Sequence, residues 1–99
     1  MNPPALTQRE LDLVRGIFRR HPEVTSATLF GSRAKGTHTD RSDVDLAVRG
    51  DVAPLQAEAL AAELDELPLP YRFEVQATDH IHHRPLIEHI KRVGILIYP

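Results

Sequence analysis

Apolar residues near the start of the chain recur at the spacing of an amphipathic helix: Leu11, Val14, Ile17 and Phe18. Thr7 and Glu10 stand just before them at the spacing of a capping box, in which each residue bonds the backbone of the other. We therefore predict a helix over residues 8–20 that is closed by His21-Pro22.

The next segments predict strands separated by a polar turn. Residues 25–30 are short and partly β-branched, which favours a strand running into Gly31. A short helix is expected to begin near Ser32–Arg33, and residues 44–48 predict a second strand.

A second amphipathic segment follows, with Asp51 expected as its N-cap and Pro54 in its first turn. It should end near Leu67, before Pro68 and Pro70. Its apolar positions form a broad face: Leu55, Ala59, Leu60, Ala62, Leu64 and Leu67.

Residues 71–77 alternate between apolar and polar side chains, which is the clearest strand pattern in the chain. A last helix should start near Pro85 and finish at Gly94. The apolar run 95–98 is either a short strand or a patch that docks elsewhere. The resulting order, α-β-α-β-α-β-α, predicts one α/β (α+β) domain over residues 1–99, built on a small sheet.

Composition narrows the class of protein. A formal charge of −2 with 5% aromatic residues gives no basic stripe for DNA or RNA, so direct nucleic-acid binding is not expected. The chain has no cysteine, which excludes thiolate metal sites and fits a reducing compartment. No apolar run approaches the ~20 residues that span a bilayer. Residues 1–4 lack the character of a signal peptide, so we expect a cytoplasmic domain.

Two carboxylates stand at the start of the second predicted strand. Asp43 and Asp45 are two residues apart and should emerge on the same face, about 7 Å apart along the backbone. Such a pair repels unless a cation lies between them, and Mg²⁺ prefers carboxylate oxygens combined with substrate phosphates. The alternative is two solvated acids at the junction of a loop and a strand.

A small-residue turn precedes these acids. Gly31 lets the backbone approach a ligand closely, and its amide with the Ser32 hydroxyl can donate to phosphate oxygens. Arg33 and Lys35 add positive charge, although either suits an exposed surface as well. A glycine–serine pair after a strand is also an ordinary turn.

Glu74 lies on the polar face of the clearest strand, and neighbouring strands would bring it beside Asp43 and Asp45. It would then complete a metal site or accept a proton as a general base. The alternative is an exposed glutamate on an open sheet face. The histidines at positions 80, 82 and 83 favour a polar loop over a metal site.

The run Gly31-Ser32-Arg33-Ala34-Lys35-Gly36, followed by Ser42-Asp43-Val44-Asp45-Leu46-Ala47, resembles the signature of the DNA polymerase β-like nucleotidyltransferase superfamily. It is nearest to the minimal nucleotidyltransferases, the MNT group, and the similarity extends from about residue 25 to the end of the chain. The resemblance implies a mixed β-sheet flanked by helices.

The resemblance also implies a chemistry. Gly31 and Ser32 would contact a nucleoside triphosphate such as ATP, with Arg33 and Lys35 beside it. Asp43, Asp45 and Glu74 would bind Mg²⁺, two ions during catalysis, while a hydroxyl attacks the α-phosphorus. The third acid of the superfamily is most often aspartate, and Glu74 reaches one methylene farther.

Proteins of the MNT group are typically encoded beside an all-helical partner, either a HEPN-type toxin or a related substrate-binding protein. The resemblance therefore implies transfer of a nucleotide monophosphate, AMP from ATP, to a hydroxyl of such a partner in a hetero-oligomer or homodimer. The competing hypothesis is a module that acts by binding its partner, through an apolar surface at residues 95–98.

Overall fold

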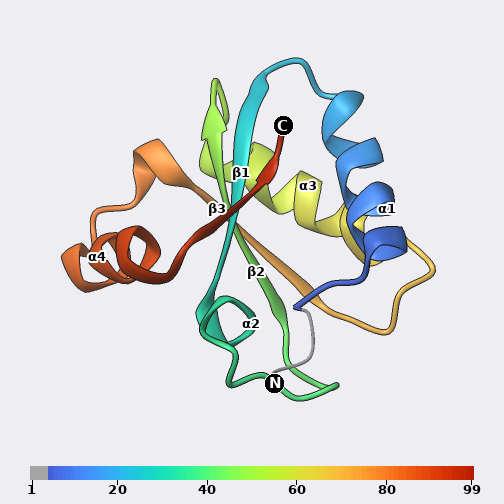
Figure 1. The fold of residues 1–99 in the computed structure, drawn as a ribbon. Coiled ribbons are helices and arrows are strands. Elements are labelled where there is room, and N and C mark those ends of the chain that lie inside the picture. Colours follow the sequence, from blue (N-terminus) through green and yellow to red (C-terminus); the bar gives the residue numbers. More distant parts are fainter. Residues whose placement is uncertain (1–4) are drawn as a thin grey trace.

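The computed structural model describes residues 5–99, a mixed four-stranded sheet with helices on both faces (Figure 1). Residues 1–4, to which the expectation about a signal peptide refers, lie outside the described part. The elements are α1 (Gln8–Arg19), β1 (Val24–Phe30), α2 (Gly31–Lys35), β2 (Val44–Gly50), α3 (Pro54–Asp65), β3 (Phe73–Ala77), the 3₁₀ turn η1 (Thr78–His80), α4 (Arg84–Val93) and β4 (Ile95–Tyr98).

The strands lie in the order β3-β2-β1-β4. β1 is antiparallel to β2 and β4, whereas β2 and β3 are parallel. In Figure 1, α1 and α3 lie together on one side of the sheet, α4 lies on the other side, and α2 lies at the end of the sheet where β1 finishes. The predicted fold class, a mixed sheet flanked by helices, is confirmed.

The main core lies between the sheet and the pair α1 and α3. Alternation along β2 directs Val44, Leu46 and Val48 into this core and turns Asp45 toward the opposite face. The helices contribute the fully buried Val14, Phe18 and Leu64, among others. One face of the sheet is thus packed, which leaves the face that carries Asp45 for α4 and for chemistry.

The capping box that the sequence predicts at α1 is confirmed. The Thr7 hydroxyl accepts a hydrogen bond from the Glu10 amide at 3.2 Å, and the Glu10 carboxylate accepts one from the Thr7 amide at 2.8 Å. The prediction that Asp51 caps α3 is wrong, because the N-cap is Ala53. The Ala53 amide donates to the Gln56 side chain at 2.9 Å, which is the half of a capping box that satisfies the amide of the N-cap residue.

The last segment resolves into β4, which pairs with β1 and makes the sheet four-stranded rather than three-stranded. Its residues divide between two environments. Ile97 is buried in the core, while 45% of Ile95 and 62% of Leu96 remain exposed. Both alternatives for this apolar run therefore hold in part, since it is a strand that also leaves an apolar surface.

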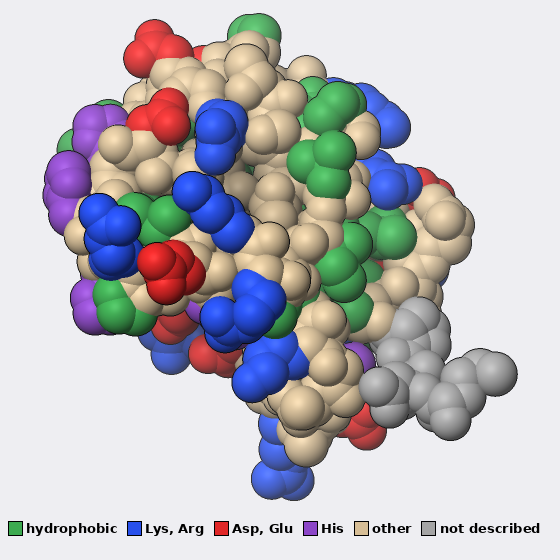
Figure 2. Space-filling view, turned by 60° about the vertical axis from the view of Figure 1, so that its left-hand side comes forward, with side chains coloured by type: hydrophobic (Ala, Val, Ile, Leu, Met, Phe, Trp, Pro, Cys, Tyr) green, Lys and Arg blue, Asp and Glu red, His purple; other side chains and the backbone are tan. Residues whose placement is uncertain are grey.

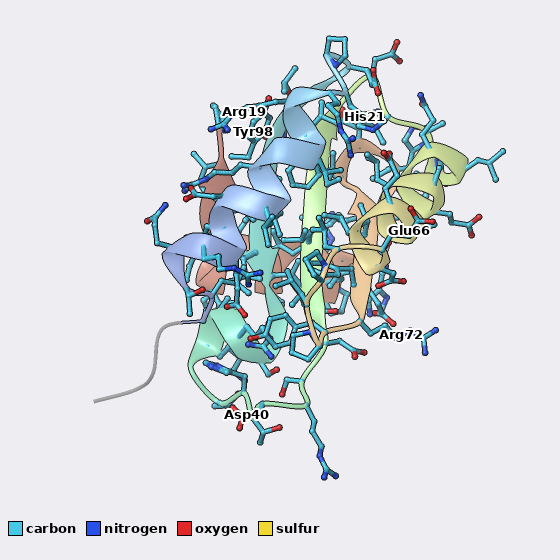
Figure 3. All side chains as sticks on the ribbon, turned by 90° about the vertical axis from the view of Figure 1, so that its right-hand side faces the viewer. Arg19, His21, Asp40, Glu66, Arg72 and Tyr98 are labelled. Carbon is cyan, nitrogen blue, oxygen red and sulfur yellow. The ribbon has the colours of Figure 1, made fainter. Side chains whose placement is uncertain are left out.

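His21, at the end of α1, joins the two helices on the packed face (Figure 3). Its Nδ1 lies 3.0 Å from the Glu23 carboxylate, and its Nε2 is hydrogen-bonded to Glu63 of α3. Glu63 is also within 3.6 Å of the Arg20 guanidinium. The helix-end histidine thus fixes α1 against α3.

No helix within residues 5–99 combines the length and the apolar character that crossing a membrane requires.

Candidate functional site

The strand register places two of the three predicted acids side by side. Asp45 of β2 is the partner of Phe30 on β1 and of Glu74 on β3, so the three residues form one row across the sheet. Gly31 follows Phe30 directly. The end of β1, the start of β2 and the start of β3 therefore meet at a single place, as the sequence predicts.

Gly31 packs its backbone against the carboxylate of Asp45. A Cβ atom at position 31 would lie only 2.2 Å from Asp45 Oδ2 and 3.2 Å from its Cγ. The residue also has a φ of +75°, a conformation that L side chains rarely adopt. Glycine is required here on both counts, and the turn lies in direct contact with the acid.

The three acids concentrate negative charge at Asp45. Burial, together with the nearby carboxylates of Glu74 and Asp43, raises the pKa of Asp45 to about 6, with Glu74 within hydrogen-bonding reach. Asp43 itself is exposed, because it precedes β2 at the end of the turn 37–43. The arrangement is costly for the ionised carboxylate of Asp45.

The residues fit a divalent cation in their chemistry. Carboxylate oxygens are the ligands that Mg²⁺ prefers, and a cation beside Asp45 would relieve the repulsion that raises its pKa. Within residues 5–99, however, no three acidic, histidine or cysteine groups converge closely enough to form a ready-made metal cluster. Asp45 and Glu74 lie within hydrogen-bonding reach of each other, and the exposed Asp43 is near enough for its charge to act on Asp45.

Arg33, expected beside a phosphate, has other partners. Only 4% of it is exposed, and its guanidinium donates to the backbone carbonyls of Ala5 and Ser42 at 2.9 and 3.0 Å. It also makes a longer contact of 3.4 Å with the carbonyl of Thr39. Because Ser42 immediately precedes Asp43, the buried arginine fixes the turn 37–43, which leads into Asp43 and Asp45. Its contacts make it a positioning residue instead of a nucleotide ligand.

A second layer holds Arg33 in place. Its guanidinium stacks 4.2 Å from the centre of the Tyr71 ring, and the Tyr71 hydroxyl donates to the buried Glu10 carboxylate at 2.6 Å. Burial raises the pKa of Glu10, but hydrogen bonds from Thr7 and Tyr71 outweigh it and leave the pKa below its ordinary value. This chain of contacts ties α1 and the segment before β3 to the turn 37–43.

Ser32 is half-buried and Lys35 is exposed at the end of α2, where Gly36 ends the helix in a left-handed conformation with φ +80°.

The α4 side of the molecule adds positive charge. Figure 2 shows Lys and Arg side chains gathered across this face, and Arg84, Lys91 and Arg92 of α4 are all exposed. The formal charge of −2 does not reveal this local basic character.

His89 of α4 is a member of the site that the sequence reasoning missed. The Gly31 amide donates to His89 Nε2 at 3.1 Å, and the imidazole packs edge-on against the Phe30 ring. The available signal was its position, since His89 lies three residues after Leu86 and four before Val93, on the half-buried side of the helix. His80, His82 and His83 lie elsewhere, at η1 and the loop after it.

The family comparison agrees with this geometry. The family model described as "Polymerase beta, Nucleotidyltransferase" matches residues 12–99. The chain belongs to this family. No curated protein shows significant sequence similarity to it.

Solved structures share the nucleotidyltransferase fold at low sequence identity. A toxin–antitoxin structure with AMP-PNP is 20% identical, with a TM-score of 0.71 over 93% of this chain and 73% of the other. A tri-AMPylated Shewanella oneidensis HEPN toxin in complex with an MNT antitoxin gives 17% identity and a TM-score of 0.72, over 93% and 71% of the two chains. The toxin–antitoxin MntA–HepT gives 17% and 0.71, over 92% and 71%.

Two glycines provide a matched test of the contact with Asp45. Gly31→Ala places a Cβ against Asp45 at a positive φ, and we expect a loss of at least about 2 kcal/mol of unfolding free energy. Gly16→Ala lies inside α1 with nothing within 4 Å, and we expect a gain of ~0.5–1 kcal/mol. Urea unfolding measures both, and equal effects of the two substitutions would contradict the contact.

Asp45 of this nucleotidyltransferase should make stability fall as pH rises. The folded chain holds the Asp45 proton up to about pH 6, while the unfolded chain releases it near the ordinary value of 3.8. Asp45→Asn should therefore match the wild type below pH 3.8 and exceed its stability above pH 6. We expect a gain of roughly 1 kcal/mol, because water still screens the half-buried group.

Urea unfolding at pH 3.6 and pH 7.5 without divalent cations checks this difference. Asp79→Asn, an exposed acid of η1, is the matched control and should show no such pH-dependent gain. An Asp45→Asn protein that is less stable than the wild type at pH 7.5 would refute the electrostatic account.

Proposed function

We propose that this nucleotidyltransferase moves a nucleotide monophosphate, AMP from ATP, onto a hydroxyl of a partner protein in a Mg²⁺-dependent reaction. The observation that carries the proposal is the packing of Gly31 on Asp45, with Glu74 beside it in the same row of the sheet. Mg²⁺ is usually bound by carboxylates and substrate phosphates together, so the phosphate-binding turn and the cation-binding pair have to lie this close.

Each residue has a role in this proposal. The Ser32 hydroxyl and nearby backbone amides bind the triphosphate, and exposed Lys35 neutralises part of its charge. Asp43, Asp45 and Glu74 would hold Mg²⁺, which would neutralise phosphate charge. Arg33 keeps the turn before Asp43 in place.

The proposed transfer proceeds by direct displacement. The acceptor oxygen forms a bond to the α-phosphorus, the bond from that phosphorus to the pyrophosphate oxygen breaks, and pyrophosphate leaves with the electron pair. Glu74 accepts the proton of the acceptor hydroxyl. Glu74 is exposed and adjoins Asp45, so an approaching acceptor can reach it.

The proposed partner is an all-helical HEPN-like protein, and the proposed setting is the cytoplasm. Support comes from the shared fold with the MNT antitoxin that was solved with a tri-AMPylated HEPN toxin.

One observation favours the second candidate function, a module that neutralises its partner by contact. Ile95 and Leu96 of β4 leave apolar surface exposed, as a binding face would.

A transfer assay with α-labelled ATP, Mg²⁺ and the HEPN-like partner tests the proposal. We expect label on the partner with the wild type and a loss of at least 100-fold with Asp43→Asn or Asp45→Asn, because each removes a cation ligand. Asp79→Asn is the control and should transfer label normally.

Two further results decide between the candidates. If Asp45→Asn transfers no label but still neutralises its partner fully, contact is sufficient and the binding-module function holds. Glu74→Asp should keep more activity than Glu74→Gln, because it retains a carboxylate that can bind the ion and accept a proton. Equal activity of these two variants would remove Glu74 from the reaction.

A further inference from the structure

Within residues 5–99, no strand pairs with the outer edge of β3, next to the candidate site. β3 is the terminal strand of the sheet. The Val44 amide of β2 donates to the Arg72 carbonyl at 2.9 Å, so the backbone groups of Arg72 point toward β2. Because backbone direction alternates along a strand, the groups of Phe73 and Val75 point away from the sheet. The Phe73 amide is bonded to Asp65 Oδ1 at 2.8 Å. By the same alternation, the amide and carbonyl of Val75 are directed outward.

A groove of about 480 Å³ runs along this edge, between β3 and α3. Its α3 wall includes Ala61 and Ala62, whose small side chains leave room for another chain. A second hollow of about 250 Å³ shares Glu58, Val75 and Gln76 with the groove and extends it along the strand. The open space therefore follows the length of β3.

The groove is acidic. Glu58, Asp65 and Glu74 line it, and the one basic residue in its lining is Arg72. Figure 3 shows Arg72 at the margin of the molecule, with its side chain directed outward. An extended segment with lysine or arginine side chains would complement this charge, whereas a second copy of β3 would bring the same acids against one another.

We propose that a basic, extended segment of the acceptor protein adds to the outer edge of β3 as a fifth strand. This inference rests on the proposed transfer function and specifies how its acceptor is held. A residue paired with Glu74 would continue the row Phe30–Asp45–Glu74 and share its face, about 4.8 Å from Glu74. A hydroxyl on that residue would lie beside Glu74 and the proposed reaction centre.

The test uses a fluorescent peptide, Lys-Thr-Lys-Tyr-Lys-Val-Lys, titrated with the wild-type protein and followed by fluorescence polarisation. We expect saturable binding. The same peptide with N-methyl groups on alternate residues cannot pair with a strand edge and should bind at least tenfold more weakly. Hydrogen exchange should show that the bound peptide protects the Val75 amide.

Two exposed alanines of α3 provide matched variants. Ala62→Arg fills the groove and opposes the basic peptide, so binding should weaken at least tenfold. Ala59→Arg makes the same change at a position that lines a different hollow, and binding should be unchanged. Both variants should bind Mg–ATP like the wild type, which also shows that they are folded.

The outcomes separate this inference from the proposed function. No saturable peptide binding, equal binding of the N-methylated peptide, or equal weakening by Ala62→Arg and Ala59→Arg would overturn the β3 edge as an acceptor site. Dimerisation that Ala62→Arg abolishes would also overturn it, because a second copy would then occupy the edge. Failure of the proposed function has a different signature: the peptide binds as expected, but no label is transferred to the partner.

Discussion

Gly31 places a bare α-carbon against the Asp45 carboxylate, and the rest of the site follows from that contact. Any side chain at this position would meet Asp45 Oδ2, so the turn after β1 and the start of β2 can approach each other only through glycine. The antiparallel pairing of Phe30 with Asp45 fixes this approach from one side. The parallel pairing of Asp45 with Glu74 fixes the second acid from the other.

The packing behind the site keeps it in a conformation that is electrostatically unfavourable. Asp45 is half-buried beside two other acids, and burial with their charge raises its pKa to about 6. The turn 37–43, which ends at Asp43, stays in place because buried Arg33 donates to the carbonyls of Ser42 and Ala5. A cation bound beside Asp45 would reduce the repulsion between the carboxylates. Packing in the core, away from the carboxylates, holds the site in this conformation.

Much of the fold was predictable because local chemistry agrees with the global structure at most elements. The capping box at Thr7 and the β-branched strand before Gly31 mark their elements without tertiary information. The cap of α3 was not predictable in this way, since Ala53 has no side-chain acceptor and relies on Gln56. The acidic pair and the glycine turn were recognisable as a motif, but the roles of Arg33 and His89 depend on which distant carbonyl or amide the fold brings to them.

The proposed function requires a triphosphate and its cation to bind side by side, next to the Gly31 turn and the carboxylates of Asp45 and Glu74. A crystal structure of the protein soaked with a non-hydrolysable ATP analogue and Mn²⁺ tests it most directly, because the anomalous signal locates the ion. The account predicts Mn²⁺ bound to the carboxylates of Asp45 and Glu74, with a phosphate within hydrogen-bonding distance of Ser32. An ion that binds elsewhere, or a nucleotide with its phosphates away from Ser32, would contradict it.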